Sequence, residues 1–252
     1  MAKIIAVANQ KGGVGKTTTC INLTACLTEK GKKVLLADYD PQGNSSSGMG
    51  VSKHSRPNSY DVLVHGEEAA SAIVSLPYGD VLPSNAELSG AEVELVEMEQ
   101  REFRLKKALR AVDPYYDYIF IDCPPSLGLL TLNAFAAADS LLVPLQCEYY
   151  AMEGIADLRN TIRLTQKYLN KALTIEGILL TMYDNRLSFA SQVAEEMRGY
   201  FGDKVYETII PRNVRLSEAP SHGLPITEYD RSSKGGKAYM QAAEEFLRRQ
   251  GV

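Results

Sequence analysis

The segment from Asn9 to Thr19 has the residue types and spacing of a phosphate-binding loop. An apolar run, Ile4 to Val7, precedes it and a helical pattern follows it, so the loop would join a strand to a helix. Its glycines allow successive backbone N–H groups to turn toward one anion. Lys16 would place a charge on the β- and γ-phosphates of a nucleotide, and the Thr17 hydroxyl would bind Mg²⁺. A glycine turn without a ligand is the simpler alternative, which the order of strand, loop and helix disfavours.

The loop departs from the general pattern G-x-x-x-x-G-K-[ST] in its first half. Gln10 occupies the place of the first glycine, and a second lysine, Lys11, stands beside it. Because Lys16 already fills the lysine role of the loop, Lys11 has no evident function in binding phosphate within its own chain. An exposed lysine without a role is one interpretation.

Carboxylates end two further apolar runs that we predict as strands. Asp38 and Asp40 follow residues 33–37 in the sequence D-Y-D-P-Q-G-N, and Asp122 closes the run Y-I-F-I-D. Parallel α/β sheets bind their ligands at the carboxyl ends of strands, so these side chains are expected beside the phosphate loop. In nucleotide-binding folds an aspartate placed like Asp122 holds the water shell of Mg²⁺. A plain Asp-Pro turn is the alternative interpretation of Asp40.

Apolar runs and helical patterns alternate along the whole chain, which predicts a parallel sheet with right-handed crossovers. We expect one α/β domain over residues 1–252, with a doubly wound, mostly parallel sheet of seven to eight strands flanked by helices, as in P-loop NTPases. Strands are predicted at 4–7, 33–37, 80–82, 118–122, 140–145, 173–182 and 205–209. Helical patterns cover 18–30, 60–64, 67–75, 87–112, 129–138, 148–169, 188–200 and 233–249.

Composition narrows the function classes. The formal net charge of −4 argues against a surface that coats nucleic acid everywhere, so DNA contact would need a local basic patch. The four cysteines form no C-x-x-C pair, which disfavours an iron–sulfur site and fits a reducing cytoplasm. The most apolar stretch, 127–145, is interrupted by polar residues, so no segment is expected to span a membrane.

Five stretches together resemble one family. They are K-G-G-V-G-K-T-T, L-L-A-D-Y-D-P-Q-G-N, I-F-I-D-C-P-P-S-L-G-L-L-T-L-N-A, P-L-Q-C-E-Y-Y-A-M-E-G and I-I-P-R-N-V-R-L-S-E-A-P-S-H-G. The early lysine is typical of the deviant Walker A (ParA/MinD) superfamily, and the whole length is most similar to chromosome partition ATPases of the ParA/Soj type. The resemblance implies ATP and Mg²⁺ as cofactors and slow hydrolysis by a dimer in which Lys11 reaches the nucleotide of the second subunit.

The resemblance also assigns site residues. It implies that Lys11, Lys16 and Asp40 are catalytic, with Asp40 orienting the attacking water, although spacing alone does not separate Asp40 from Asp38. Metal contacts are expected from Thr17, Asp38 and Asp122. Nucleotide contacts are expected from Lys11, Gly12, Gly13, Val14, Gly15, Lys16, Thr17 and Thr18, and adenine contacts from Asn185, Pro211 and Asn213, which follow strands whose carboxyl ends should line one crevice.

Family members of this type bind double-stranded DNA without sequence preference as ATP dimers, and a ParB/Spo0J-type centromere-binding protein stimulates their hydrolysis. The resemblance therefore implies a cytoplasmic, nucleoid-associated protein. Six cations in the C-terminal part lie outside the predicted strands and could contact phosphate: Arg186, Arg212, Arg215, Arg231, Lys234 and Lys237. Arg215 is the first choice, and a salt bridge to Glu218 is its competing role.

Three alternatives remain. A division-site ATPase of the MinD type should end in a basic amphipathic helix on a membrane, whereas helix 233–249 carries Glu244 and Glu245 among its apolar residues and is expected to pack on the core without stable membrane association. Another cargo-positioning ATPase could use the same dimer. A nucleotide-binding scaffold without turnover is disfavoured by Asp40 and Asp122. Because the first strand begins near residue 3, no helix-turn-helix extension is expected before it.

Overall fold

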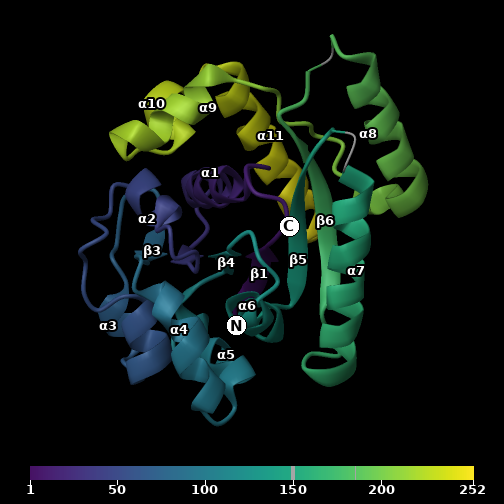
Figure 1. Cartoon of the computed structure of the whole chain (residues 1–252). Coiled ribbons are helices and arrows are strands. Elements are labelled where there is room, and N and C mark those ends of the chain that lie inside the picture. The colour runs from purple at the N-terminus through teal and green to yellow at the C-terminus, as the bar shows by residue number, and fades with distance from the viewer. Residues whose placement is uncertain (149–150, 185) are drawn as a thin grey trace.

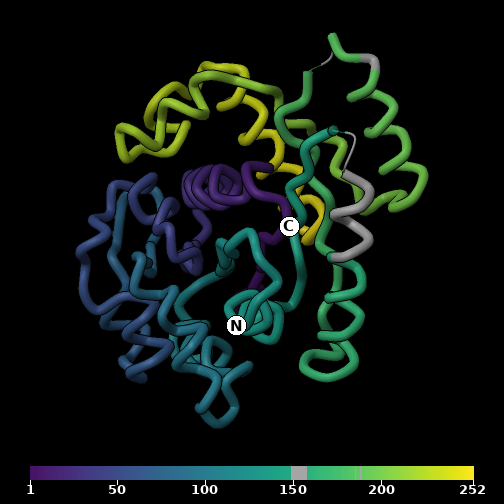
Figure 2. Tube along the Cα trace, in the orientation of Figure 1, coloured from purple at the N-terminus to yellow at the C-terminus, as the bar shows by residue number. Residues whose placement is uncertain are grey.

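The computed structural model has one parallel sheet among the residues that it describes, which are 1–148, 151–184 and 186–252, apart from the side chains of residues 151–157 and 188 (Figure 1, Figure 2). Its six strands lie in the order β3-β2-β4-β1-β5-β6. In chain order they are β1 (Lys3–Val7), β2 (Val34–Asp38), β3 (Asp80–Leu82), β4 (Tyr118–Asp122), β5 (Ser140–Gln146) and β6 (Thr174–Thr181). The predicted α/β class and parallel sheet are confirmed.

Helices connect the strands and cover both faces of the sheet (Figure 1). They are α1 (Lys16–Glu29), α2 (Asn44–Gly48), α3 (Ala69–Ala72), α4 (Leu88–Glu94), α5 (Arg104–Arg110), α6 (Leu129–Ala137), α7 (Ala151–Tyr168), α8 (Ser188–Phe201), α9 (Val214–Glu218), α10 (Ile226–Asp230) and α11 (Lys234–Arg249). Short 3-10 and π turns complete the connections. Sequence patterns missed α2, α9 and α10, because a five-residue helix is too short for a periodic signal.

Strand β1 illustrates how the sheet builds two cores. Its successive side chains point to opposite faces, so Ile5 and Val7 pack with α1 and α11, whereas Ile4 and Ala6 pack with α4 to α8. Both faces are buried, which explains why this strand is a continuous apolar run without alternation. The central position of β1, between β4 and β5, places its carboxyl end in the middle of one edge of the sheet.

The expected strand at 205–209 is wrong, and so is the expected count of seven to eight strands, since the described residues form six. This segment meets β6 only through single bridges, Val205 with Ile178 and Pro211 with Tyr183. The backbone N–H groups of Glu207 and Thr208 instead donate to the Glu245 carboxylate of α11, each at 2.8 Å. A side chain from a distant helix therefore takes the donors that a sheet ladder would have used.

Both edge strands of the sheet are covered by neighbouring chain. Along β6, Tyr206 N donates to Ile178 O and Ile210 N donates to Leu180 O, each at 2.9 Å. At the other edge, Val74 forms an antiparallel bridge with Val81 of β3, with hydrogen bonds of 2.8 and 2.9 Å. Loop segments thus occupy edge hydrogen-bonding positions at both ends of the sheet.

The helical pattern over 87–112 is interrupted. Helices α4 and α5 are separated by 3-10 turns, an extended Met98 and a left-handed Gln100 with φ 51°. Leu88 and Leu95 on one side of the break and Leu105 and Leu109 on the other all reach the core. The bend lets both halves bury their apolar residues, whereas one straight helix would have diverged from the sheet. Of the weaker patterns nearby, 60–64 corresponds to a π turn at Asp61–His65, and 67–75 shortens to α3.

The last helix packs on the core, as the sequence predicted. In α11 the side chains of Tyr239, Ala243 and Phe246 are buried beside α1 and the sheet, and Phe246 contacts the rings of Tyr118 and Phe120. Within the described part of the chain, no helix combines the length and the apolar character needed to cross a lipid bilayer.

Replacing Glu245 tests its part in the fold. Glu245→Ala should lower the free energy of unfolding by about 2–4 kcal/mol, because two backbone donors and the Arg249 guanidinium would lose their buried acceptor. Glu244→Ala is the matched control: its neighbouring carboxylate is 59% exposed and pairs with Lys30 at the surface, so the cost should stay within about 1 kcal/mol. Urea titration of both variants measures the difference, and equal losses would contradict this account.

Candidate functional site

The phosphate loop occupies residues 8–15, between the end of β1 and the start of α1. Gly13 (φ 73°) and Gly15 (φ 90°) adopt left-handed backbone that other residues rarely take. Gly15 is the N-cap of α1, no side chain caps this end, and no acidic residue lies in its first turn. The unpaired N–H groups and the positive end of the helix dipole therefore face the loop, which is the arrangement that binds phosphate.

Hydrogen bonds fasten this loop to the strands on one side. Asn9, which is buried, donates through Nδ2 to Pro144 O of β5 at 2.8 Å and accepts from Lys11 N at 3.0 Å. The Thr181 hydroxyl at the end of β6 donates to Val14 O at 2.7 Å. The loop is thus held in place by its surroundings. Sequence analysis missed both residues as supports, because each acts through a partner distant in the chain.

Lys16 is buried within the loop that it serves. Its side chain is only 6% exposed, and Nζ donates to Lys11 O at 3.1 Å. Burial lowers the pKa of the Lys16 ammonium, and the negative charges of Asp122 and Asp40 oppose that shift. An anion placed in the loop would compensate the desolvated ammonium, which is what the predicted phosphate role requires.

Asp122 is a fully buried carboxylate with an open coordination position. It lies opposite Asp38 in the register of β4 and β2. Its Oδ2 atom accepts from Ser45 Oγ at 2.8 Å, while Oδ1 has no hydrogen-bond partner among the residues that the structure describes. Burial, and then the charge of Asp38, raise the pKa of Asp122 to about 7, and hydrogen bonding from Ser45 and Thr17 opposes the rise.

These residues fit a magnesium ion that also has phosphate ligands. Thr17 and the free Oδ1 of Asp122 supply the oxygen donors that Mg²⁺ prefers. Among the described residues no cluster of three or more His, Cys, Asp or Glu side chains could hold a metal. The protein side of the site is therefore incomplete by itself, and nucleotide oxygens and water would have to provide the other ligands.

Asp38 and Asp40 differ in their surroundings. Both oxygens of Asp38 accept hydrogen bonds, from Asp40 N at 3.2 Å and from Ser46 N and Oγ at 2.7 and 2.6 Å. Burial raises the pKa of Asp38 to about 6. This carboxylate organises the loop that follows β2, and its predicted metal contact would have to share those oxygens. Asp40 is 8% exposed and, among the described residues, its carboxylate accepts only from Gln42 N, at 2.9 Å, which leaves one oxygen without a described partner.

A cavity of about 350 Å³ adjoins the phosphate loop. Pro211 and Asn213, both predicted to contact adenine, line it together with Arg212. Asn185, the third predicted adenine contact, lies outside the described residues. Further lining residues that sequence analysis missed are Thr181, Met182, Leu216, Ser217, Pro220 and Tyr239. Met182 has a left-handed φ of 49°, an unusual conformation that is often found at ligand sites, and its place just after a strand is the signal that could have indicated it.

The side chain of Lys11 pairs with a residue outside the phosphate loop of its own chain. Its Nζ atom contacts Oε2 of Glu148 at 2.5 Å, and Gln146 donates to the other oxygen of that carboxylate. The side chains of Lys11 and Glu148 are 39% and 47% exposed. Lys11 is thus a surface lysine with an acidic partner in its own chain, and its reach toward a second subunit stays a prediction.

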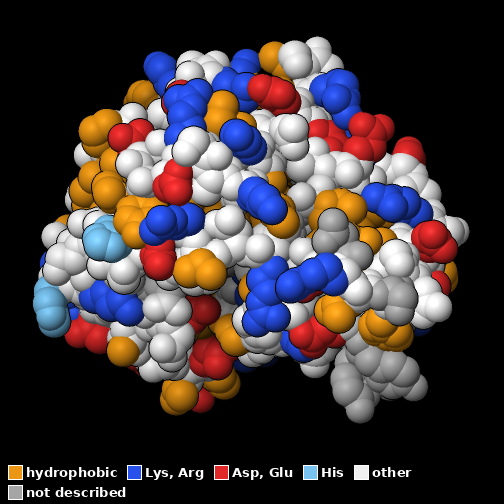
Figure 3. Space-filling model, turned by 90° about the horizontal axis from the view of Figure 1, so that it is seen from above, with side chains coloured by type: hydrophobic (Ala, Val, Ile, Leu, Met, Phe, Trp, Pro, Cys, Tyr) orange, Lys and Arg blue, Asp and Glu red, His pale blue; other side chains and the backbone are white. Residues whose placement is uncertain are grey.

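The six cations predicted to contact DNA are all exposed. Four of them come from α9, the residue after α10 and the start of α11, and these helices pack together. Arg186 and Arg212 lie on adjacent loops, since Arg212 N donates to Tyr183 O at 3.1 Å. Seen from above, Lys and Arg side chains are interleaved with Asp and Glu side chains (Figure 3). Three of the six form ion pairs: Arg186 with Asp184, Arg215 with Glu218 and Arg231 with Glu29.

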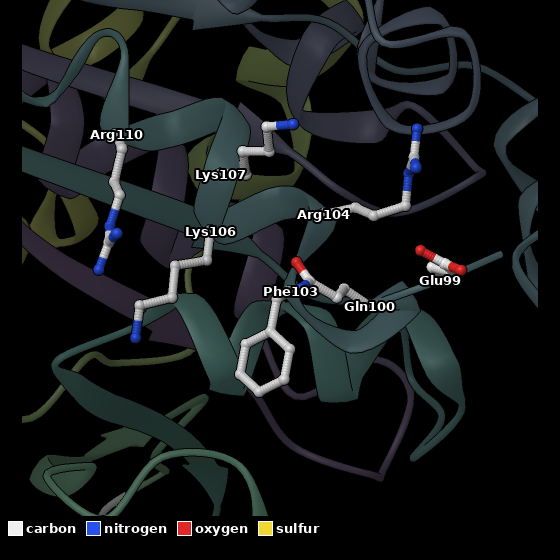
Figure 4. Close-up of a pocket in the computed structure, with 7 residues that line it drawn as sticks. All are labelled: Glu99, Gln100, Phe103, Arg104, Lys106, Lys107 and Arg110. Atoms are coloured by element: carbon white, nitrogen blue, oxygen red, sulfur yellow. The ribbon is translucent and has the colours of Figure 1, made fainter.

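A second cavity, of about 440 Å³, lies on α5 and contains none of the motif residues (Figure 4). Lys106 and Arg110 point the same way beside Phe103, whereas Arg104 points away to the carbonyl groups of Leu63 and Val64. Its side chains are mostly cationic, with the carboxylate of Glu99 among them, and it contains neither a glycine loop nor the buried aspartates of the phosphate loop.

The chain is similar in sequence and fold to known proteins. Residues 2–175 match the family described as AAA domain. The chain is 57% identical over 248 residues to the sporulation initiation inhibitor protein Soj of Bacillus subtilis, covering 97% of this chain and 98% of that protein. It is 53% identical to the chromosome partitioning protein ParA of Myxococcus xanthus, covering 99% and 89%. A crystal structure of cobyrinic acid a,c-diamide synthase from Mycobacterium smegmatis with bound ATP analogue and magnesium has a TM-score of 0.85 and 37% identity, covering 100% and 97%.

The raised pKa of Asp122 predicts a pH-dependent stability difference. Its folded value of about 7 exceeds the ordinary 3.8, so ionisation disfavours folding once the pH rises above about 4, and the full cost is present above about 7. In metal-free, nucleotide-free buffer, Asp122→Asn should therefore match the wild type at pH 4 and be more stable by roughly 2–4 kcal/mol at pH 8. Thermal or urea unfolding at both pH values measures this. Asp203→Asn, at an exposed carboxylate, is the control, and an Asp122→Asn effect independent of pH would contradict the assignment.

Proposed function

Because the chain belongs to the ParA/Soj family of chromosome-partitioning ATPases, we propose that it is a Mg²⁺-dependent ATPase that partitions DNA as an ATP-bound dimer. The observation that carries the proposal is that the buried ammonium of Lys16 and a buried carboxylate oxygen of Asp122 without a described partner lie near each other at the N-terminus of α1. The ammonium needs an anion and the carboxylate needs a cation. A nucleotide phosphate with Mg²⁺ satisfies both.

In the proposed complex the loop from Gly12 to Thr18 holds the phosphates through backbone N–H groups, and Lys16 neutralises the β- and γ-phosphates. Magnesium, held by Thr17 and through water by Asp122, would supply charge neutralisation at the phosphates. The base enters the cavity beside Pro211 and Asn213. A neighbour in structure with an ATP analogue and magnesium bound supports this choice of cofactors.

Asp40 is the proposed water-orienting residue. It is nearly buried, one carboxylate oxygen is free of described hydrogen bonds, and its charge is close enough to influence the pKa of both Lys16 and Asp122. Asp38 supports the same loop with both oxygens engaged. Asp40 would position the attacking water, while Asp38 would fix the geometry of the loop.

Dimerisation is proposed to complete the site. Lys11 lies on the exposed side of the loop, and in its own chain it pairs with Glu148 instead of the phosphate site. In a dimer, Lys11 would leave Glu148 and contact the γ-phosphate of the nucleotide bound by the second subunit. A cation supplied in trans in this way can raise the hydrolysis rate by about 10³–10⁵.

The remaining parts of the proposal concern partners. The exposed cations of the C-terminal part would bind DNA phosphate without reading bases, so the protein would associate with the nucleoid. A ParB/Spo0J-type protein would stimulate hydrolysis and release the dimer. The apolar face of α11 is buried on the core, so this helix is not available to a membrane, which favours this role over a MinD-like one.

Lys16→Ala tests nucleotide binding. Removing the buried ammonium should weaken ATP binding at least about 100-fold and abolish phosphate release, because the loop would lose its own cationic contact with the β- and γ-phosphates. Lys33→Ala removes an exposed lysine before β2 and should change neither quantity. Calorimetry with Mg-ATP and a phosphate-release assay give the answer, and unchanged ATP affinity in Lys16→Ala would rule out the assigned site.

A pair of variants separates hydrolysis from dimerisation. Asp40→Ala should bind ATP, lose hydrolysis at least about 100-fold and accumulate as a dimer. Gly12→Val should bind ATP as a monomer: Gly12 has no positive φ and its added Cβ would meet only Pro125 Cβ, at 3.9 Å, so the chain tolerates the side chain while a facing loop would not. Size-exclusion chromatography with ATP distinguishes them. If both run as monomers, the trans role of Lys11 is wrong.

A further inference from the structure

The Arg215 guanidinium is held by two carboxylates of its own chain. Its Nη1 atom lies 2.9 Å from Oε2 of Glu218, one turn along α9, and its Nε atom lies 3.4 Å from Oδ2 of Asp230 at the end of α10. The side chains of Arg215 and Glu218 are nevertheless 53% and 39% exposed. The ion pair is therefore on the surface, where a phosphate from solution can approach the arginine.

Glu218 is held at the point where it meets Arg215. Its Oε2 atom also accepts a hydrogen bond from Tyr229 Oη at 3.2 Å, and the Tyr229 ring stacks on His222 with 4.9 Å between ring centroids. Asn213 caps the start of the same helix by accepting from Arg215 N at 3.0 Å. The acidic partner and the backbone that carries the arginine are both fixed, so the ion pair is a preformed contact within α9, joined to α10 through Tyr229 and Asp230.

The other cations predicted to contact DNA differ from Arg215 in their ion pairs. Within the described part of the chain, no ion pair is formed by Arg212, Lys234 or Lys237. Lys234 and Lys237 could approach phosphate without giving up an internal partner, whereas Arg212 acts on Asp184, where hydrogen bonding and then the charge of Arg212 lower the pKa of the carboxyl. Arg215 must first leave Glu218 or share its donors with it, so its contact with phosphate is opposed by the protein itself.

We propose that Glu218 limits the affinity of this protein for DNA by competing with DNA phosphate for Arg215. The inference rests on the proposed function, because it concerns the regulation of the same DNA contact. Carboxylate and phosphate oxygens are alternative partners for one guanidinium fork. An exposed ion pair is weak, so the competition lowers the affinity without abolishing binding.

Glu218→Gln removes the competing charge and keeps the size of the side chain and an acceptor for Tyr229. Full-length wild type and variants are titrated with a duplex of arbitrary sequence, with Mg²⁺ and a non-hydrolysable ATP analogue, over a salt series. Glu218→Gln should bind about two- to fivefold more tightly, the amount expected for an exposed ion pair. The slope of log K against log salt should steepen by about 0.9 for each additional DNA phosphate that the variant neutralises.

Glu228→Gln is the matched control. It removes the same charge from α10, where Glu228 is exposed and forms no ion pair among the described residues. It should tighten binding less than Glu218→Gln, because it acts only through the screened net charge. Nucleotide affinity is measured for each variant, so that a change in the ATP site is not mistaken for a change in the DNA contact.

The decisive comparison repeats Glu218→Gln in an Arg215→Ala background. If Glu218 acts through Arg215, the two- to fivefold increase in affinity disappears there, which is the non-additivity of a direct partner. An increase that persists without Arg215, or one no larger than that of Glu228→Gln, overturns the inference and leaves DNA binding intact. Absence of DNA binding by the wild type overturns the proposed function, and the inference with it.

Discussion

The structure depends on an unbalanced set of buried charges where β1, β2 and β4 end. Sheet register places Asp38 opposite Asp122, and Lys16 is the one nearby cation that burial encloses within the described chain. Two carboxylates whose pKa values are raised and an ammonium whose pKa is lowered indicate a site under electrostatic stress in the absence of ligand. The fold tolerates this arrangement because serine hydroxyls and backbone N–H groups hold the carboxylates in place. Ligand binding would relieve this electrostatic stress, so a bound nucleotide would raise the free energy of unfolding.

Helix α1, which follows the phosphate loop, is hydrogen-bonded directly to the helices proposed to bind DNA. Thr19 Oγ1 of α1 and Tyr239 Oη of α11 form a buried hydrogen bond at 3.1 Å, and Asn22 Oδ1 of α1 accepts from Ile226 N at the start of α10 at 2.8 Å. The cavity beside the phosphate loop is lined by Leu216 and Ser217, on the helix that also carries Arg215. The proposed nucleotide and DNA contacts therefore share short physical connections, through which occupancy of one site could bias the other.

Features encoded by near neighbours in sequence were predictable, and features made by distant partners were not. The loop between β1 and α1 was predicted in place, with the helix start two residues late, and β4 was predicted with its bounds, because glycine spacing and an apolar run closed by Asp122 are local signals. The strand expected at 205–209 failed because Glu245, some forty positions later, takes its backbone donors. Likewise Glu218, one turn from Arg215, was foreseen as its partner, whereas Asp230 on another helix was not. Asn9 and Thr181 hold the loop through contacts that no local pattern encodes.

The covering of both sheet edges has a consequence for how copies of this protein can meet. Single residues of neighbouring loops occupy hydrogen-bonding positions beside β6 and β3, so among the described residues neither edge presents an uninterrupted ladder onto which another chain could add a strand. Joining of two sheets through backbone hydrogen bonds would be difficult to reverse. Association through side chains and nucleotide alone can be undone when one phosphate leaves. A sheet that does not accept a further strand thus keeps self-association weak enough for nucleotide binding and hydrolysis to reverse it.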